Sequence, residues 1–114
     1  MICSFADVVV VPFPFVDRPI AKTRPALVFS SIAFNEEHDQ SVLAMITTGA
    51  HSSWPSDIVI DDGESACLAH RSVICWKLFT LPNRAILKKL GTLAAKDVAA
   101  VKRSARRYFA VQSP

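Results

Sequence analysis

Residues 24–30 read Arg-Pro-Ala-Leu-Val-Phe-Ser, so an arginine and a proline directly precede an apolar run. Upstream, residues 7–13 read Asp-Val-Val-Val-Val-Pro-Phe, a Val-rich run that predicts a buried strand. A proline is tolerated where a strand begins, so we expect a second strand over 25–31. A third strand is expected over 41–47. Arg24 would then lie at the open end of an apolar sheet, where a ligand can reach it.

The rest of the chain predicts further short strands and then one helix. Strands are expected over 57–61 and 72–80, separated from the earlier ones by loops over 12–23 and 48–56. Residues 34–40 are polar and irregular, with room for one helical turn.

Residues 82–89 predict a short helical turn that Gly91 ends. The tail 94–110 predicts a longer helix, whose N-terminus has no capping side chain unless Thr92 serves. One face of this helix is apolar at helical spacing, and its members are Val98, Val101, Ala105 and Tyr108. The other flank is basic, with Lys102, Arg103, Arg106 and Arg107.

Short strands followed by a helix predict an α+β, mostly β fold: a small, strongly bent antiparallel barrel with a C-terminal helix. The 114 residues, of which 51% are hydrophobic, are enough for one globular domain over 1–114. No apolar run approaches the ~20 residues of a membrane-spanning helix, and the start lacks signal-peptide features. We therefore expect a cytoplasmic protein without a membrane span.

Cysteine and histidine spacing predicts neither a disulfide frame nor a metal site, so we expect no metal and no cofactor. The residues concerned are Cys3, Cys67, Cys75, His38, His51 and His70.

Charge is segregated along the chain, although the net charge is only +3. Residues 1–70 contain three Lys or Arg against nine Asp or Glu, whereas residues 71–114 contain ten against one. Such polarity suits a protein that holds a polyanion or an acidic partner against one side. A solvated basic helix face is the alternative interpretation.

The second and third strands can be paired by their numbers. If Val28 faces Leu43 and Ala26 faces Met45 in an antiparallel pair, the same register sets Arg24 opposite Thr47 on one face. A slip of one residue would separate the two side chains. The hypothesis therefore brings a guanidinium and a hydroxyl to one rim of the sheet, from which both long loops leave.

Four segments, in order, resemble the MazF/PemK family of toxin endoribonucleases. They are 7–17 (Asp-Val-Val-Val-Val-Pro-Phe-Pro-Phe-Val-Asp), 22–30 (Lys-Thr-Arg-Pro-Ala-Leu-Val-Phe-Ser), 45–48 (Met-Ile-Thr-Thr) and 71–93, which begins Arg-Ser-Val-Ile-Cys-Trp. The likeness covers roughly residues 6–100, and the ordered set is more specific than any single segment.

The resemblance implies an SH3-like barrel of the MazF/CcdB type with a C-terminal helix. It also implies the toxin component of a type II toxin-antitoxin system, a homodimer that cleaves single-stranded RNA without metal and inhibits growth. The implied partner is a small, acidic, partly disordered antitoxin. The family's catalytic arginine and threonine correspond to Arg24 and Thr47, and both residue types suit stabilisation of a phosphorane.

Other rim residues are candidates for substrate binding. Phe15 and Trp54 offer faces for base stacking, and Lys22 and Thr48 offer donors to phosphate. The remaining candidates are Asp17 and His51. Asp17 alternatively caps a turn, and His51 is either a proton acceptor or an exposed loop histidine. The general base is left unidentified: His51 is one candidate, and Asp17 and Lys22 are further candidates.

The chain departs from the family pattern in three places, one of which is 65–68, where relatives often have a glycine. Relatives commonly have Gly-Asp where this chain has Ala6-Asp7, and their first loop is longer and contains glycine. Two other functions are compatible with the same fold: a gyrase poison similar to CcdB, and a catalytically silent module that binds RNA or a partner protein.

Overall fold

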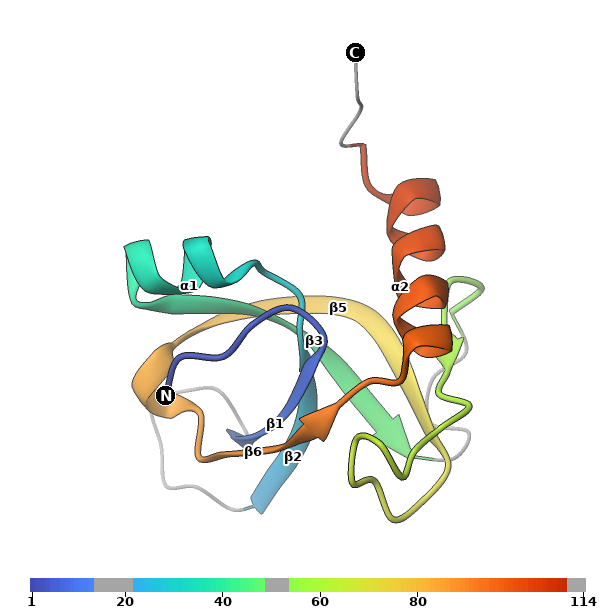
Figure 1. Ribbon diagram of the computed structural model, residues 1–114, viewed down its shortest axis with the longest axis horizontal. Helices are drawn as coiled ribbons and strands as arrows, with labels where there is room; N and C mark the ends of the chain where they lie inside the picture. The colour runs from blue at the N-terminus through green and yellow to red at the C-terminus, as the bar shows by residue number, and fades with distance from the viewer. Residues whose placement is uncertain (14–21, 49–53, 111–114) are drawn as a thin grey trace.

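The computed structural model describes residues 1–13, 22–48 and 54–110, which form a curled antiparallel sheet with two helices (Figure 1). The sheet has six strands in the order β4-β5-β3-β2-β1-β6. In chain order the elements are β1 (Asp7–Phe13), β2 (Lys22–Val28), α1 (Ile32–His38), β3 (Gln40–Thr48), β4 (Ile58–Val59), β5 (Ser72–Pro82), a 3₁₀ turn (Asn83–Ala85), β6 (Lys88–Thr92) and α2 (Ala95–Tyr108). The predicted bent antiparallel fold with a C-terminal helix is confirmed.

Two irregularities in strand pairing accompany the curl of the sheet. The β1–β6 register shifts between Val8 and Val9, and the β3–β5 register shifts between Ala44 and Met45. Such bulges bend a strand and increase its local twist. The sheet therefore wraps into an open barrel, in which β4 and β6 are the two edge strands.

The central strands are buried on both faces. One apolar cluster contains Val8, Leu27 and Ile46, and Val101 of α2 packs into it. The other face carries a second cluster, with Val9, Val11, Ala26, Val28 and Leu43. Burial on both sides explains why the sequence of β1 is continuously apolar instead of alternating.

The second strand differs from its predicted bounds. β2 begins at Lys22 and ends at Val28, so Pro25 lies inside it. The pairs with β1 run through Pro25, whereas the pairs with β3 cover only Ala26–Val28, because proline donates no ladder hydrogen bond. The strand stops before Ser30, whose N–H and that of Phe29 both donate to the Val42 carbonyl.

The predicted helical turn over 82–89 is only partly correct. A 3₁₀ turn spans Asn83–Ala85, but the chain then forms β6, and Gly91 lies inside that strand. A Cβ atom at Gly91 would lie 2.5 Å from the Ser65 carbonyl oxygen. Gly91 therefore does not end a helix. It permits a close approach between β6 and the segment that joins β4 to β5.

The two helices also refine the predictions. α1 extends over Ile32–His38, and Ser31 caps it by accepting from Phe34 N–H at 3.3 Å. α2 starts after Ala94, whose methyl group cannot cap. Thr92 belongs to β6 and does not cap α2, because its hydroxyl donates to Asp7 at 2.9 Å.

The apolar face of α2 was predicted correctly except at its end. Val101 is fully buried, and Val98 and Ala105 pack against the same core, but Tyr108 is 47% exposed. Phe109 packs in its place against Trp76, with ring centroids 5.0 Å apart. Neither helix in the described ranges is long and apolar enough to cross a membrane.

A buried polar network holds the end of the barrel near α1. The Asn83 amide donates to the Asn35 carbonyl at 2.7 Å and accepts from the Ser41 hydroxyl at 2.6 Å. The Asn35 amide donates to the Cys3 carbonyl at 2.8 Å. These bonds join the N-terminal segment, α1, β3 and the 3₁₀ turn through side chains that are almost completely buried.

Candidate functional site

The predicted register of β2 and β3 is confirmed where the strands pair. Ala26 faces Met45 and Val28 faces Leu43. Strand alternation places Arg24 on the face of Ala26, and Thr47 on the face of Leu43. Continuing this register by two residues would set Arg24 opposite Thr47. The pairs between β2 and β3 stop at Ala26, however, so the pairing of Arg24 with Thr47 stays a prediction.

Thr47 has an unusual environment for a hydroxyl. Its Oγ1 atom is buried, and within the described part of the chain it makes no hydrogen bond. A buried polar group without a partner costs about 1–3 kcal/mol. Among the described residues nothing satisfies the Thr47 hydroxyl, so this hydroxyl is suited to a ligand.

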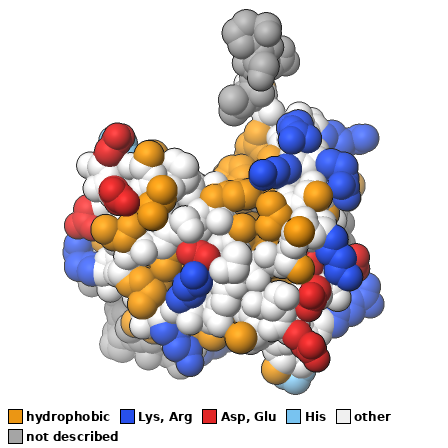
Figure 2. All heavy atoms as spheres, in the orientation of Figure 1, with side chains coloured by type: hydrophobic (Ala, Val, Ile, Leu, Met, Phe, Trp, Pro, Cys, Tyr) orange, Lys and Arg blue, Asp and Glu red, His pale blue; other side chains and the backbone are white. Residues whose placement is uncertain are grey.

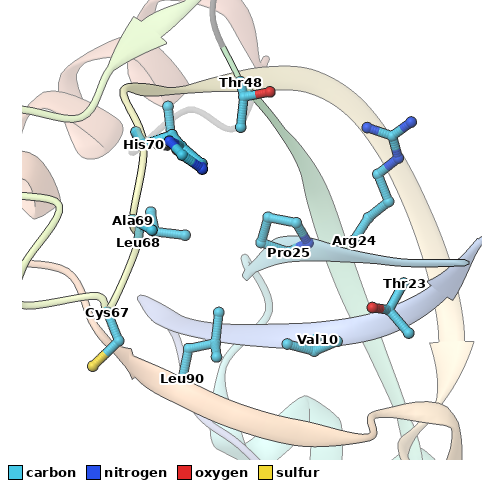
Figure 3. Close-up of a pocket in the computed structure, with 11 residues that line it drawn as sticks. Val10, Thr23, Arg24, Pro25, Thr48, Cys67, Leu68, Ala69, His70 and Leu90 are labelled. Carbon is cyan, nitrogen blue, oxygen red and sulfur yellow. Dashed lines mark hydrogen bonds between the residues drawn. The ribbon is translucent and has the colours of Figure 1, made fainter.

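Next to this rim lies a cleft of about 240 Å³. One wall comes from β1 and β2, through Val10, Thr23, Arg24 and Pro25, and the other from the segment 67–70 (Figure 3). Leu90 of β6 lies at one end and Thr48 of β3 at the other. Figure 3 shows the Arg24 side chain directed away from Pro25 and away from the segment 67–70.

The wall formed by 67–70 is held by contacts that join distant parts of the chain. Asp97 of α2 is buried, and its carboxylate accepts from Asp61 N–H at 2.9 Å and Asp62 N–H at 3.0 Å. Thr92 N–H donates to the Ser65 carbonyl at 3.2 Å, beside the close approach at Gly91. β6 and α2 therefore fix the segment that closes the cleft.

His70 is a residue of this cleft that sequence reasoning did not select. Its side chain is exposed, and Figure 3 shows the ring turned into the cleft near Thr48. The Ser72 hydroxyl donates to the His70 carbonyl at 2.9 Å, which fixes the backbone just before β5. Its place two residues before the predicted strand 72–80 was the available signal, because the position of Arg24 at the start of a strand selected that residue.

The other predicted site residues differ in where they lie. Thr48 lines the cleft together with Arg24. Lys22 is exposed at the start of β2, on the same face as Arg24. Trp54 is 44% exposed, with Lys77 Nζ 5.4 Å from its ring centroid, and it is not among the cleft-lining residues.

Three predicted site residues cannot be placed. Phe15, Asp17 and His51 lie outside the described residues.

Basic side chains gather on α2 (Figure 2), where Lys102, Arg103, Arg106 and Arg107 are exposed. The carboxylate of Asp7, in contrast, is buried in β1 and forms an ion pair with Lys89 at 3.2 Å. Burial alone raises the pKa of Asp7. Hydrogen bonds from Ser4 and Thr92, together with the bond and positive charge of Lys89, outweigh burial and lower this pKa below its ordinary value.

The cysteines and histidines form no recognisable metal centre in the part of the chain that the structure covers. Cys3, Cys67 and Cys75 are free thiols. Among the described residues, no three His, Cys, Asp or Glu side chains are grouped so that they would hold a metal ion.

Residues 4–109 match the family described as PemK-like, MazF-like toxin of type II toxin-antitoxin system. The chain belongs to this toxin family. The match spans the cleft, both of its walls and α2, so the PemK/MazF-like resemblance of the sequence is confirmed. No curated protein matches the sequence.

Solved structures of MazF toxins share the fold of this PemK/MazF-like chain. An endoribonuclease in complex with its cognate antitoxin, from a mycobacterial species, is 16% identical with a TM-score of 0.76, covering 98% of this chain and 99% of that one. MazE-MazF of Deinococcus radiodurans is 17% identical with a TM-score of 0.74 and the same coverage. Mycobacterium tuberculosis toxin MazF-mt6 is 18% identical with a TM-score of 0.71, covering 94% and 99%.

Proposed function

We propose that this PemK/MazF-like toxin is an endoribonuclease that cleaves single-stranded RNA without a metal ion. The observation that carries the proposal is the cleft where Arg24 and Thr48 lie together, beside the buried Thr47 hydroxyl. In the proposed reaction the 2′-hydroxyl of RNA attacks the adjacent phosphate. The enzyme then has no nucleophile to supply, and DNA is excluded because it lacks that hydroxyl.

Arg24 suits the charge that develops in this reaction. A guanidinium is always protonated and presents a planar fork of donors that matches two phosphate oxygens. Arg24 is half-buried at the edge of the cleft. Partial removal of water strengthens its attraction for a dianionic phosphorane relative to that of a fully exposed arginine.

Thr47 would supply a neutral donor beside it. The Thr47 hydroxyl would donate to a phosphorane oxygen and so acquire a partner that the described residues do not give it. Thr48 and the exposed Lys22 would contact the flanking phosphates. Removal of one such donor typically lowers the rate by roughly 10²–10³-fold.

The exposed charges of the toxin and one of its structural neighbours support a protein partner. The mycobacterial structure contains a cognate antitoxin, and the exposed cations of α2 suit an acidic antitoxin segment in this chain as well. We include in the proposal a homodimer that acts in the cytoplasm.

The test uses the purified protein, a long single-stranded RNA and EDTA, with cut sites mapped by primer extension. Arg24→Ala should lower cleavage by about 10²–10³-fold. Arg84→Ala is the matched control, because Arg84 is an exposed arginine of the 3₁₀ turn and is not among the cleft-lining residues. The products should carry 2′,3′-cyclic phosphate and 5′-hydroxyl ends.

The nuclease activity, its metal independence and its location in this cleft each have their own contrary result. Intact RNA after incubation with folded wild-type protein contradicts the nuclease and favours a gyrase poison or a silent binding module. Cleavage that stops in EDTA contradicts metal independence. Cleavage that persists in Arg24→Ala moves the reaction away from this cleft.

A further inference from the structure

We infer that His70 is the general base of the cleft, the group that takes the proton from the attacking 2′-hydroxyl. The inference rests on the RNA cleavage proposed above and assigns a role that the sequence left open. It is carried by the position of the His70 ring, which lines the same cleft as Arg24 and Thr48 (Figure 3).

The chemistry of the cleft requires a proton acceptor that its other polar residues do not provide. A guanidinium does not lose its proton in proteins, and a threonine hydroxyl is a poor base at neutral pH. Cys67 also lines the cleft, but Figure 3 shows its sulfur directed away from the interior. Among the described lining residues, His70 has the side chain type that exchanges protons near neutral pH.

The structure holds His70 firmly enough for such a role. Its carbonyl accepts the Ser72 hydroxyl at 2.9 Å, and Ser72 is buried at the start of β5. The preceding turn is closed by Leu68 N–H, which donates to the Gly63 carbonyl at 2.8 Å. The imidazole itself is exposed, so it can reach a substrate and afterwards return its proton to water.

Charged groups face His70 from both sides. Arg24 of β2 lies across the cleft. On the other side, Asp61, Glu64 and Arg71 line a second hollow that His70 also borders. Two carboxylates and two guanidinium groups therefore surround His70, so the nearby charges are of both signs.

The proposed step balances without a further reactant. The neutral His70 ring removes the 2′-hydroxyl proton as the 2′-oxygen forms a bond to phosphorus. The bond from phosphorus to the 5′-oxygen breaks, and that oxygen takes a proton from water. The imidazolium then gives its proton to the hydroxide that remains, leaving a 2′,3′-cyclic phosphate and a 5′-hydroxyl.

The first experiment compares His70→Gln with His38→Gln in the EDTA cleavage assay. General-base loss should lower the rate by about 10²-fold or more. His38 is an exposed histidine at the end of α1 and not among the cleft-lining residues, so its variant should keep the wild-type rate. Thermal unfolding of both variants confirms that the exposed substitutions leave the fold intact.

The second experiment separates a general base from a group that only binds RNA. The cleavage rate of the wild-type protein should rise with pH across the neutral range to a plateau. In His70→Gln this rise of the rate with pH should be lost. Added imidazole should restore cleavage in His70→Ala. A substrate with sulfur in place of the scissile 5′-oxygen needs no acid for its leaving group, so His70→Gln should remain slow on it.

The outcomes distinguish this inference from the proposed function. A wild-type protein that leaves RNA intact overturns both. If wild-type protein cleaves and Arg24→Ala does not, an unchanged rate in His70→Gln overturns the role of His70 alone. Recovery of His70→Gln on the sulfur substrate also overturns it, because His70 would then be the acid.

Discussion

The two ends of the β2–β3 hairpin carry polar side chains in opposite states. We call the network of Asn35, Ser41 and Asn83 the closed end, because its side chains are buried and hydrogen-bonded to one another and to the backbone. The rim, made of Arg24, Thr47, Thr48 and His70, is partly exposed and contains a buried hydroxyl that the described chain leaves without a partner.

The difference shows how to distinguish polar residues that stabilise the fold from polar residues that are suited to bind a ligand. At the closed end, loss of one group leaves another buried group unsatisfied, so the network contributes stability. At the rim, the Thr47 hydroxyl makes no hydrogen bond with the described residues, so we expect it to add little to stability. Substitutions at the two ends should therefore change different measurements.

The largest effect is expected at the rim and on catalysis. Thr47→Val keeps the shape of the side chain and removes the hydroxyl, so cleavage should fall by roughly 10²–10³-fold. The free energy of unfolding should stay the same or rise, because a buried unsatisfied group is lost. RNA cleavage and urea unfolding of one preparation test both statements. A destabilised Thr47→Val would show that the hydroxyl belongs to the fold.

The next effect is expected at the closed end and on stability. Asn83→Ala removes the partners of the Asn35 carbonyl and the Ser41 hydroxyl, so the free energy of unfolding should fall by about 3 kcal/mol. Below its melting temperature the variant should cleave RNA at the wild-type rate. Arg84→Ala, an exposed neighbour, should change stability by no more than about 0.5 kcal/mol. Loss of cleavage in folded Asn83→Ala would show that the closed end also affects catalysis at the rim.

Asp7 extends the comparison to pH, because its carboxylate is buried and satisfied like the closed end. Its pKa in the folded protein lies below the ordinary Asp value of about 3.9. The resulting stability is therefore complete above that value and is lost as pH falls through the lowered pKa. The stability of Asp7→Asn should lack this contribution, which depends on pH in the acidic range. Urea unfolding from neutral to acidic pH measures it, and parallel curves for both proteins would contradict it.

The smallest effect concerns Ala6, which has a φ of 77°. Left-handed backbone costs a non-glycine residue about 1–2 kcal/mol. Ala6→Gly relieves this cost but loses a buried methyl group, so its stability should change by less than about 1 kcal/mol. Ala26→Gly, equally apolar and buried in β2, should be less stable than Ala6→Gly by about 1–2 kcal/mol. Equal losses would show that Ala6 is not strained.

The sequence predicted the parts of the rim that depend on local pattern. β1 has the predicted bounds, and the β2–β3 register followed from matching apolar positions. β6 was missed, because Lys-Lys-Leu-Gly-Thr has no strand alternation and Gly91 is explained only by its contact with Ser65. The cleft wall with His70 depends on such contacts between distant segments, which no local pattern encodes.

The two tryptophans give the molecule separate optical reporters. Trp76 is 7% exposed, its indole N–H donates to the Ser104 hydroxyl at 2.8 Å, and it packs against Phe109. Its fluorescence should be blue-shifted, protected from iodide and sensitive to undocking of α2. Trp54 is 44% exposed beside Lys77 and should emit at longer wavelength and be readily quenched. One emission spectrum therefore distinguishes undocking of α2, which changes the emission of Trp76, from changes in the surroundings of Trp54.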